Sequence, residues 1–477
     1  MGRRSEQEAT IIDDPAQPAT ATSGDTTARP ERVLTIAEFT DNYGPAHSGL
    51  LYALHFLEEQ VLKAGHRLLL VAPVADGPNP FAGYPRRREI RLPSVQLPGT
   101  GMRISMGQDF DYRLAQLVAN PPDVIHVHGL GAVGLLGMWV AQRTGKPLVV
   151  TWHTDFEAYA DHYWHLVPFL TAAYRVYTMH LEGSTWNELK KLAAKRPRRG
   201  GAQVELLQVC ANMLADAELV TTPSSKTAKR VLELAPNARV RVVPNGTDPL
   251  PVGATVPRAR GPRLLYVGRI SPEKGIELLL DAFALVRDAV PDAELMIVGQ
   301  WESTPLGLRH KLGKAARFGG VKLVGEVAHD RLGSYYASAD VFIFPSLTDT
   351  QALVLHEAAH AGLPIVLVDH ELRLVVDPGV NAELGRPNPV SFAAATIRML
   401  DELKDPSFAE AAAARSRELA AQWSVAAQSR EFVDIYEAVA DGRPVPLTEG
   451  LQPDYGRRIF PRRKVTATLE APPSEVG

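Results

Sequence analysis

The segment of residues 339–367 places a strand, a loop, a helix and a second strand in close succession. Residues 341–344 form an apolar run with β-branched and aromatic members, which predicts a strand buried on both faces. From Ala352 onward the apolar residues follow helical spacing, and Gly362 and Pro364 stand where a helix ends. A buried strand that leads into a helix through a short loop is the unit of parallel α/β sheets. We therefore expect an α/β fold.

The loop of this segment carries polar groups suited to a ligand. Asp349 and Thr350 stand where N-cap residues belong, and a helix start attracts phosphate because its first backbone N–H groups lack intrahelical acceptors. The N–H groups expected to face the ligand are those of Gln351, Ala352 and Leu353. Asp349 could accept hydrogen bonds from sugar hydroxyls, and Glu357 could reach a second polyol such as a ribose. The plainer interpretation is an N-cap aspartate and a solvated glutamate.

A second segment, residues 263–288, repeats the pattern of strand, loop and helix and carries two cations on its loop. Arg269 stands at the end of the expected strand, and Lys274 stands just before the expected helix. Arginine offers a planar fork of donors and lysine offers a point charge, so together they could neutralise a departing diphosphate. The plainer interpretation is ordinary surface charge.

These two segments, VGRISPEKGIELLLDAF and PSLTDTQALVLHEAAHAGLPIV, resemble the C-terminal half of the family 4 retaining glycosyltransferases, which have the GT-B fold. The resemblance implies two Rossmann-like domains whose parallel sheets face an interdomain cleft. It identifies Arg269 and Lys274 with the diphosphate-binding pair, and Asp349 and Glu357 with the acidic motif, in which aspartate replaces the usual first glutamate. The turn that contacts the base matches residues 323–327, and its matching residues are Gly325 and Val327.

The resemblance extends from Arg32 to about Tyr436 and adds residues of the N-terminal half. A glycine loop near the donor phosphates matches Gly49, with Ser48 where the family usually has a second glycine. A histidine beside the transferred sugar matches His128. The residues expected on the acceptor side are Tyr43, His153 and Asp155.

The histidines raise the question of a metal. His126, His128, His153 and Asp155 could in principle surround an ion, but their spacing follows strand ends and matches no ligand motif. We expect His126 to point to the opposite face of its strand from His128, into the core. The resemblance implies a metal-independent enzyme with no cofactor, in which the nucleotide-sugar is a co-substrate and cationic side chains replace a divalent ion.

The chain divides at a turn-rich linker. The expected divisions are a disordered extension at 1–30, an acceptor domain at 31–243, the linker at 244–261, a donor domain at 262–422, a C-terminal helix at 423–442 and a flexible tail at 443–477. We expect the helix at 423–442 to cross back to the N-terminal domain.

Composition excludes some classes of function. Lys and Arg number 51 against 54 for Asp and Glu, so the overall charge does not favour nucleic acid as a partner. Cys210 stands alone, which excludes an intrachain disulfide framework and agrees with a reducing compartment. Residues 1–32 lack the apolar core of a secretory signal. We expect a cytoplasmic protein, either soluble or peripheral at the inner face of the plasma membrane.

The function that the resemblance implies is transfer of a hexose from a UDP-sugar or GDP-mannose to an acceptor hydroxyl, with retention at the anomeric carbon. Residues 90–106 resemble the branch that glycosylates membrane lipids of the diacylglycerol or phosphatidylinositol type. Basic groups at Tyr84–Arg88 and at residues 187–199 could contact anionic headgroups, or they could be plain solvated surface. A soluble sugar or small metabolite stays open as the acceptor.

Two other classes of protein stay open. An isomerase of similar two-domain fold would eliminate and re-add the nucleotide, although the run at residues 268–275 fits transferases better. A catalytically inactive, binding-only relative would explain the departures from the family pattern at Ser48, Asp349 and Ala352, the last of which stands where the family usually has glycine.

Overall fold

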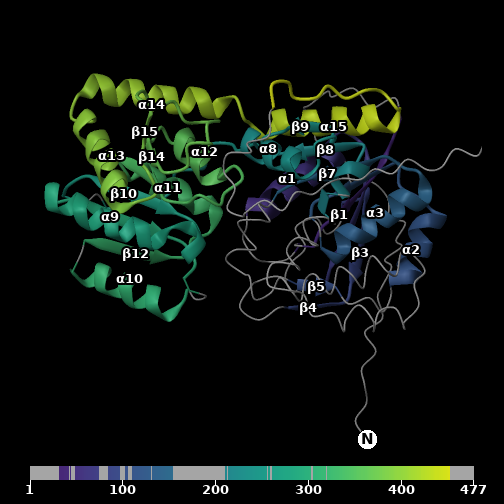
Figure 1. Ribbon diagram of the computed structural model, residues 1–477, viewed down its shortest axis with the longest axis horizontal. Helices are drawn as coiled ribbons and strands as arrows, with labels where there is room; N and C mark the ends of the chain where they lie inside the picture. The colour runs from purple at the N-terminus through teal and green to yellow at the C-terminus, as the bar shows by residue number, and fades with distance from the viewer. Residues whose placement is uncertain are drawn as a thin grey trace, which may run out of the picture.

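The computed structural model describes residues 32–41, 43, 49–74, 84–96, 103–105, 110–129, 131–153, 210–211, 213–254, 256–257, 260–301, 304–318 and 320–451. These residues form two lobes that lie side by side (Figure 1), one built on a 7-stranded sheet and the other on a 6-stranded sheet. We call them the N-terminal and C-terminal domains. The predicted α/β class with two parallel, Rossmann-like sheets is confirmed.

The N-terminal domain is built on a sheet whose neighbouring strands all pair in parallel. In spatial order the strands are β3 (Arg87–Leu92), β2 (Arg67–Pro73), β1 (Thr35–Phe39), β6 (Val124–Val127), β7 (Leu148–Thr151), β8 (Leu219–Thr222) and β9 (Val240–Val242). The helices named in this part are α1 (Gly49–Lys63), α2 (Phe110–Ala119), α3 (Ala132–Thr144) and α8 (Ser225–Leu234). A separate antiparallel pair consists of β4 (Ser94–Gln96) and β5 (Arg103–Ser105).

The C-terminal domain repeats this plan. Its parallel sheet consists, in spatial order, of β12 (Val321–Gly325), β11 (Glu294–Val298), β10 (Arg263–Val267), β13 (Val341–Phe344), β14 (Ile365–Leu367) and β15 (Ala382–Leu384). Its helices are η2 (Pro272–Lys274), α9 (Ile276–Ala289), α10 (Leu306–Phe318), η3 (His329–Arg331), α11 (Leu332–Ala337), α12 (Leu353–His360), α13 (Pro389–Glu402) and α14 (Pro406–Ala421). Every residue of β10, β13 and β14 is buried, as expected for central strands covered on both faces.

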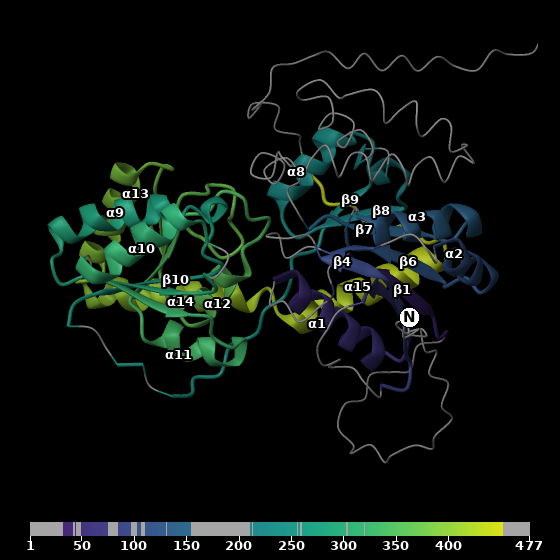
Figure 2. The same ribbon diagram turned by 90° about the horizontal axis from the view of Figure 1, so that it is seen from below.

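The last helix, α15 (Val425–Ala440), belongs in space to the N-terminal domain. It contacts α1 and β6, and Figures 1 and 2 show it running along the N-terminal lobe. Its Phe432, Ile435 and Tyr436 share a buried apolar cluster with Leu34 and Ile36. The chain therefore returns to its first domain after completing the second one.

The residues after α15 differ from the sequence prediction. Thr448 donates its backbone N–H to the carbonyl of Val240, 3.1 Å away, and its hydroxyl accepts from the N–H of Val242 at 2.8 Å. Val445 is buried. Residues 443–451 thus pack beside β9, so the predicted start of a flexible tail at 443 is too early. The other predicted domain boundaries stay predictions.

Candidate functional site

The loops that follow β10 and β13 meet at an ion pair between two predicted site residues. Lys274 Nζ lies 2.6 Å from Asp349 Oδ1, and both side chains are mostly buried. The turn after Lys274 fits closely against the end of β13, because Gly275 has a φ of +73° and a Cβ there would lie 2.5 Å from the carbonyl oxygen of Pro345. The parallel pairing of β10 with β13 therefore places both loops at one edge of the sheet.

The carboxyl of Asp349 is kept ionised by its neighbours. Burial raises its pKa, but Lys274, a hydrogen bond from Ser346 and the charge of Lys226 together outweigh burial and lower the pKa below its ordinary value. The site thus holds a fixed negative charge beside a cation. A sugar hydroxyl could donate to such a carboxylate.

Arg269 lies on the same loop as Lys274 but remains accessible. Its side chain is 51% exposed and forms an ion pair with Glu273 at 3.2 Å. The backbone carbonyl of Arg269 accepts a hydrogen bond from the hydroxyl of the buried Tyr266, at 3.0 Å. The backbone at Arg269 is therefore fixed while its guanidinium faces solvent.

Helix α12 begins later than the sequence predicted. Ala352 is its N-cap residue, with φ +61° and ψ +79°, so Asp349 and Thr350 do not cap it. No residue in the described part of the chain accepts a hydrogen bond from the backbone N–H groups of residues 351–354. Successive free N–H groups beside a left-handed residue form an anion-binding concavity at the positive end of a helix.

Ala352 is the single non-glycine residue with positive φ in the described part of the chain. We expect Ala352→Gly to raise the free energy of unfolding by roughly 1 kcal/mol, because Cβ strain in this region exceeds the entropy that glycine loses. Thermal denaturation measures this. The matched control, Ala359→Gly inside α12, should lose stability by at least a similar amount. A loss of stability in both variants would contradict the strain at Ala352.

Glu357 is held by two residues that the sequence prediction missed. The hydroxyl of Tyr336 donates to Oε2 at 2.6 Å, and Nε2 of His329 lies 2.9 Å from Oε1. The hydrogen bond to Glu357 raises the pKa of His329 above its ordinary value. The carboxylate is thus oriented from α11 and η3. Nothing in the local pattern of residues 329–336 pointed to this role.

The remaining predicted donor residues lie at strand and helix ends. Gly325, with φ +89°, is the last residue of β12, and its carbonyl accepts from the N–H of Gly299 at 2.8 Å. Val327 follows and packs against the core of the C-terminal domain. Gly49 is the first residue of α1.

The side chain of Gln351 binds Asn245, which follows β9 in the predicted linker between the two domains. Its Oε1 accepts from the backbone N–H of Asn245 at 2.8 Å, and its Nε2 donates to the carbonyl of Asn245 at 2.9 Å. A pocket of about 220 Å³ opens at this junction, and Gln351 lines it. Other residues of its wall are Ser224, Lys226, Lys229, His356 and Arg373. The structure therefore uses the side chain of Gln351 at the contact with this linker.

Two predicted histidines come together at the end of the N-terminal sheet. His128 Nδ1 lies 3.2 Å from His153 Nε2, and the rings are stacked. Burial lowers the pKa of His128 well below its ordinary value, with His126 and His153 adding to this effect, and burial lowers the pKa of His153 to about 3. Both rings are therefore neutral at physiological pH and available for hydrogen bonding.

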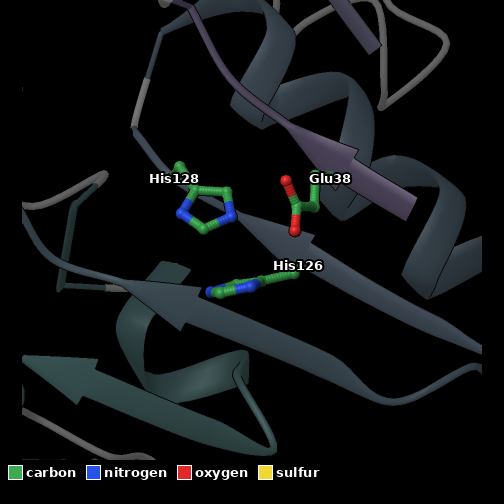
Figure 3. A group of neighbouring side chains, drawn as sticks. All are labelled: Glu38, His126 and His128. Carbon is green, nitrogen blue, oxygen red and sulfur yellow. The ribbon is translucent and has the colours of Figure 1, made fainter. Parts of the chain in front are cut away.

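His126 lies beside His128, with ring centroids 3.8 Å apart. The prediction that they occupy opposite faces is wrong, because side chains at positions i and i+2 of a strand point to the same face. Glu38, the neighbour of His126 across the parallel β1–β6 pair, completes the group. Figure 3 shows the Glu38 carboxylate facing both rings. The glutamate within the otherwise largely apolar strand TIAEF is the sequence feature from which this group of buried polar residues could have been predicted.

Glu38, His126 and His128 are the cluster in the described residues whose ligand atoms could hold a metal ion, since these lie within 4.8 Å of one another. Both nitrogens of His126 are already engaged, however. Nδ1 lies 2.7 Å from the hydroxyl of Tyr436, and Nε2 lies 2.6 Å from the hydroxyl of Thr151. A metal would have to displace one of these hydroxyls, so the group fits a cation poorly. The absence of a catalytic metal stays a prediction.

Glu38 has no exposed surface, and neither carboxylate oxygen has a donor among the described residues. Burial raises its pKa well above the ordinary value, Glu58 raises it further and Arg87 opposes them. The folded protein therefore retains a proton that the unfolded chain releases, and stability falls as pH rises from about 4.5 through the raised pKa.

We expect Glu38→Gln, which mimics the protonated acid, to be more stable than the parent protein at pH 8 by on the order of 1 kcal/mol or more. The difference should vanish near pH 4.5, and chemical denaturation at both pH values measures it. Glu410→Gln on the exposed side of α14 is the control. Bound metal in the parent protein that is lost from Glu38→Gln would contradict this interpretation.

The predicted basic surface is only partly exposed. Tyr84, Arg86 and Arg88 are exposed. The side chain of Arg87 is buried and bonds to Glu58 at 2.7 Å and to the hydroxyl of Tyr43 at 2.9 Å. Arg87 is therefore unavailable to a headgroup, a correction to the prediction, and Tyr43 is a buried part of the N-terminal domain. Ser48, Asp155 and residues 187–199 lie outside the described residues.

Comparisons with known proteins cover both domains. Residues 51–249 match the family described as Glycosyltransferase Family 4, and residues 261–402 match the family described as Glycosyl transferases group 1. The alpha-monoglucosyldiacylglycerol synthase of Acholeplasma laidlawii is 24% identical over 368 residues, which are 73% of this chain and 84% of that protein.

Two solved structures share the fold. Sucrose-phosphate synthase from Thermosynechococcus elongatus aligns with a TM-score of 0.62 and 21% identity, covering 86% of this chain and 100% of that chain. HepE of Anabaena, solved in complex with UDP-glucose, aligns with a TM-score of 0.59 and 16% identity, covering 85% and 100%. No helix among the described residues is both long enough and apolar enough to span a membrane.

Proposed function

We propose that this chain, a glycosyltransferase of the GT-B type that resembles family 4, acts on a membrane lipid. The proposed reaction transfers a hexose from a nucleotide-sugar to a hydroxyl of a membrane glycerolipid, with retention at the anomeric carbon. A UDP-sugar is preferred as donor, with GDP-mannose as the alternative. The observation that carries the proposal is the row of free backbone N–H groups at residues 351–354, next to the loop of Arg269 and Lys274.

The proposed roles follow from charge and position. The N–H groups that begin α12 bind the diphosphate, and Arg269 and Lys274 stabilise the negative charge that grows on it as the sugar departs. Asp349 accepts hydrogen bonds from the sugar, and Glu357, already oriented by Tyr336, binds the ribose. Gly325 and Val327 lie near the base.

The acceptor approaches from the N-terminal domain in this proposal. The neutral pair of His128 and His153 offers hydrogen bonds to sugar or acceptor hydroxyls. The departing phosphate takes the proton of the attacking hydroxyl, so no side chain has to act as a base and no metal is needed. The name of the Acholeplasma relative, a synthase of a glucosylated diacylglycerol, supports a lipid acceptor. Such an enzyme would work at the inner face of the plasma membrane.

A transfer assay tests this function. Purified protein is incubated in chelator with UDP-glucose or GDP-mannose and with vesicles that contain diacylglycerol or phosphatidylinositol. We expect a glycolipid whose new bond has the α configuration. Transfer to soluble sugars alone would favour the second candidate, a transferase of small metabolites. Interconversion of the sugar without any acceptor would favour an isomerase.

A further inference from the structure

A buried lysine of the N-terminal domain reaches across to the loop that carries Asp349. Lys226, in the first turn of α8, has 5% of its surface exposed. Its Nζ lies 2.8 Å from the carbonyl oxygen of Leu347, 2.8 Å from that of Asp349 and 2.6 Å from Oδ2 of Asp369. The three donors of the ammonium group are thus all used.

Asp369 supplies the counter-charge for Lys226. It follows β14, has no exposed surface, and its second oxygen accepts from the backbone N–H of Glu371 at 3.0 Å. The ion pair therefore lies inside the contact between the two domains. Removing one partner alone would leave the other charge buried and uncompensated.

Further contacts from the N-terminal domain hold the same loop. The hydroxyls of Ser224 and Thr227 both donate to the carbonyl of Thr350. The hydroxyl of Thr350 donates in turn to the carbonyl of His153, 3.0 Å away. The backbone of residues 347–350 is thus fixed by one domain, while the Asp349 carboxylate is fixed by Lys274 and Ser346 of the other.

We propose that Lys226 is a positioning residue that completes the donor site when the two domains are in contact. By holding the carbonyls of Leu347 and Asp349, it sets the direction of the Asp349 carboxylate and of the free N–H groups that follow. This inference rests on the proposed function and adds to it a role for the N-terminal domain in assembling the donor site. Lys226 itself touches no part of the nucleotide-sugar.

The test compares a single and a double variant. Lys226→Met keeps the length of the side chain but removes its donors. We expect kcat to fall about tenfold or more, the rate factor that corresponds to the loss of one charged hydrogen bond. The dissociation constant of UDP should rise by a smaller factor than kcat falls, because the N–H groups that bind the diphosphate lose part of their positioning while the proposed ribose site at Glu357 is held from α11 and η3 of the other domain. Lys314→Met on the exposed side of α10 is the control and should leave both values unchanged.

The double variant separates positioning from simple stability. Lys226→Met combined with Asp369→Asn leaves no uncompensated charge, so its melting temperature should recover toward that of the parent protein. Its kcat should stay low, because the carbonyls of Leu347 and Asp349 remain without a donor. Recovery of kcat together with the melting temperature would overturn the proposal.

Hydrogen exchange gives a readout that does not depend on activity. We expect the amides of Thr348, which donates to Ser346 Oγ, and of Leu355, which donates to the carbonyl of Ala352, to exchange faster in Lys226→Met and in the double variant than in the parent protein. Lys314→Met should match the parent. Unchanged exchange in both variants would overturn the positioning role. Absence of transfer activity in the parent protein would instead count against the proposed function, leaving the exchange result to decide the role of Lys226.

Discussion

Replacing Arg269 with alanine lowers kcat for sugar transfer on the order of a hundredfold or more, by analogy with the loss of one donor from a preorganised oxyanion site. The guanidinium is half exposed and its ion pair with Glu273 lies within a single loop, so the fold does not depend on it. The melting temperature should therefore change little. Steady-state kinetics with saturating donor, together with thermal denaturation, measure both quantities.

A matched control uses another exposed arginine. Arg398 on α13 forms an ion pair with Glu383 at 2.6 Å, and its side chain is exposed to a similar degree as that of Arg269. Arg398→Ala should retain full activity. If Arg269→Ala also kept at least half of the parent kcat, Arg269 would have no part in stabilising the leaving group.

Replacing Asp349 with asparagine lowers kcat roughly 10- to 100-fold, because the charged acceptor of the sugar hydroxyls becomes a neutral amide that also carries an NH2 donor. The change also weakens the pairing with Lys274, whose side chain is partly accessible to solvent, so we expect a stability loss of about 1 kcal/mol. Activity should thus suffer far more than folding. Kinetics and denaturation on the same preparation give the comparison.

Asp401→Asn is the matched control for this second variant. Asp401 is exposed and pairs with Lys404 at 2.7 Å near the end of α13. This control should change neither kcat nor the melting temperature measurably. A loss of activity in Asp349→Asn that merely follows its loss of folded protein would show that Asp349 is structural.

Elements buried on both faces were predictable from the sequence. The run at 341–344 became β13 with the same bounds, because an apolar run of that length between turn residues has few alternatives. For the first strand, the largely apolar run at residues 32–36 predicts a strand with those bounds, whereas β1 runs from Thr35 to Phe39. Arg32 and the backbone N–H of Thr35 both bond to the carboxylate of Asp123, so the chain enters the sheet three residues later. End contacts of this kind depend on distant residues.

The parts of the candidate site that the sequence could not show depend on long-range contacts or on unusual backbone geometry. Lys226 lies on an amphipathic helix, where a lysine normally faces water, and its partner Asp369 is far away in the chain. The left-handed conformation of Ala352 could not be predicted from the sequence, because alanine disfavours that backbone conformation. Arg269, Lys274, Asp349 and Glu357 were predicted from their places between strands and helices and from the family resemblance. Parallel strands bring the loops that carry such residues to a common edge of the sheet.

The most direct test of the central claim, that this chain uses a nucleotide-sugar, is a calorimetric titration of the purified protein with UDP and then GDP in the presence of a chelator. We expect one of the two nucleotides, UDP in preference, to bind at a single site without metal, and Glu357→Gln to weaken this binding. Binding of neither nucleotide would contradict the proposed transfer reaction and favour an inactive relative of the GT-B glycosyltransferases.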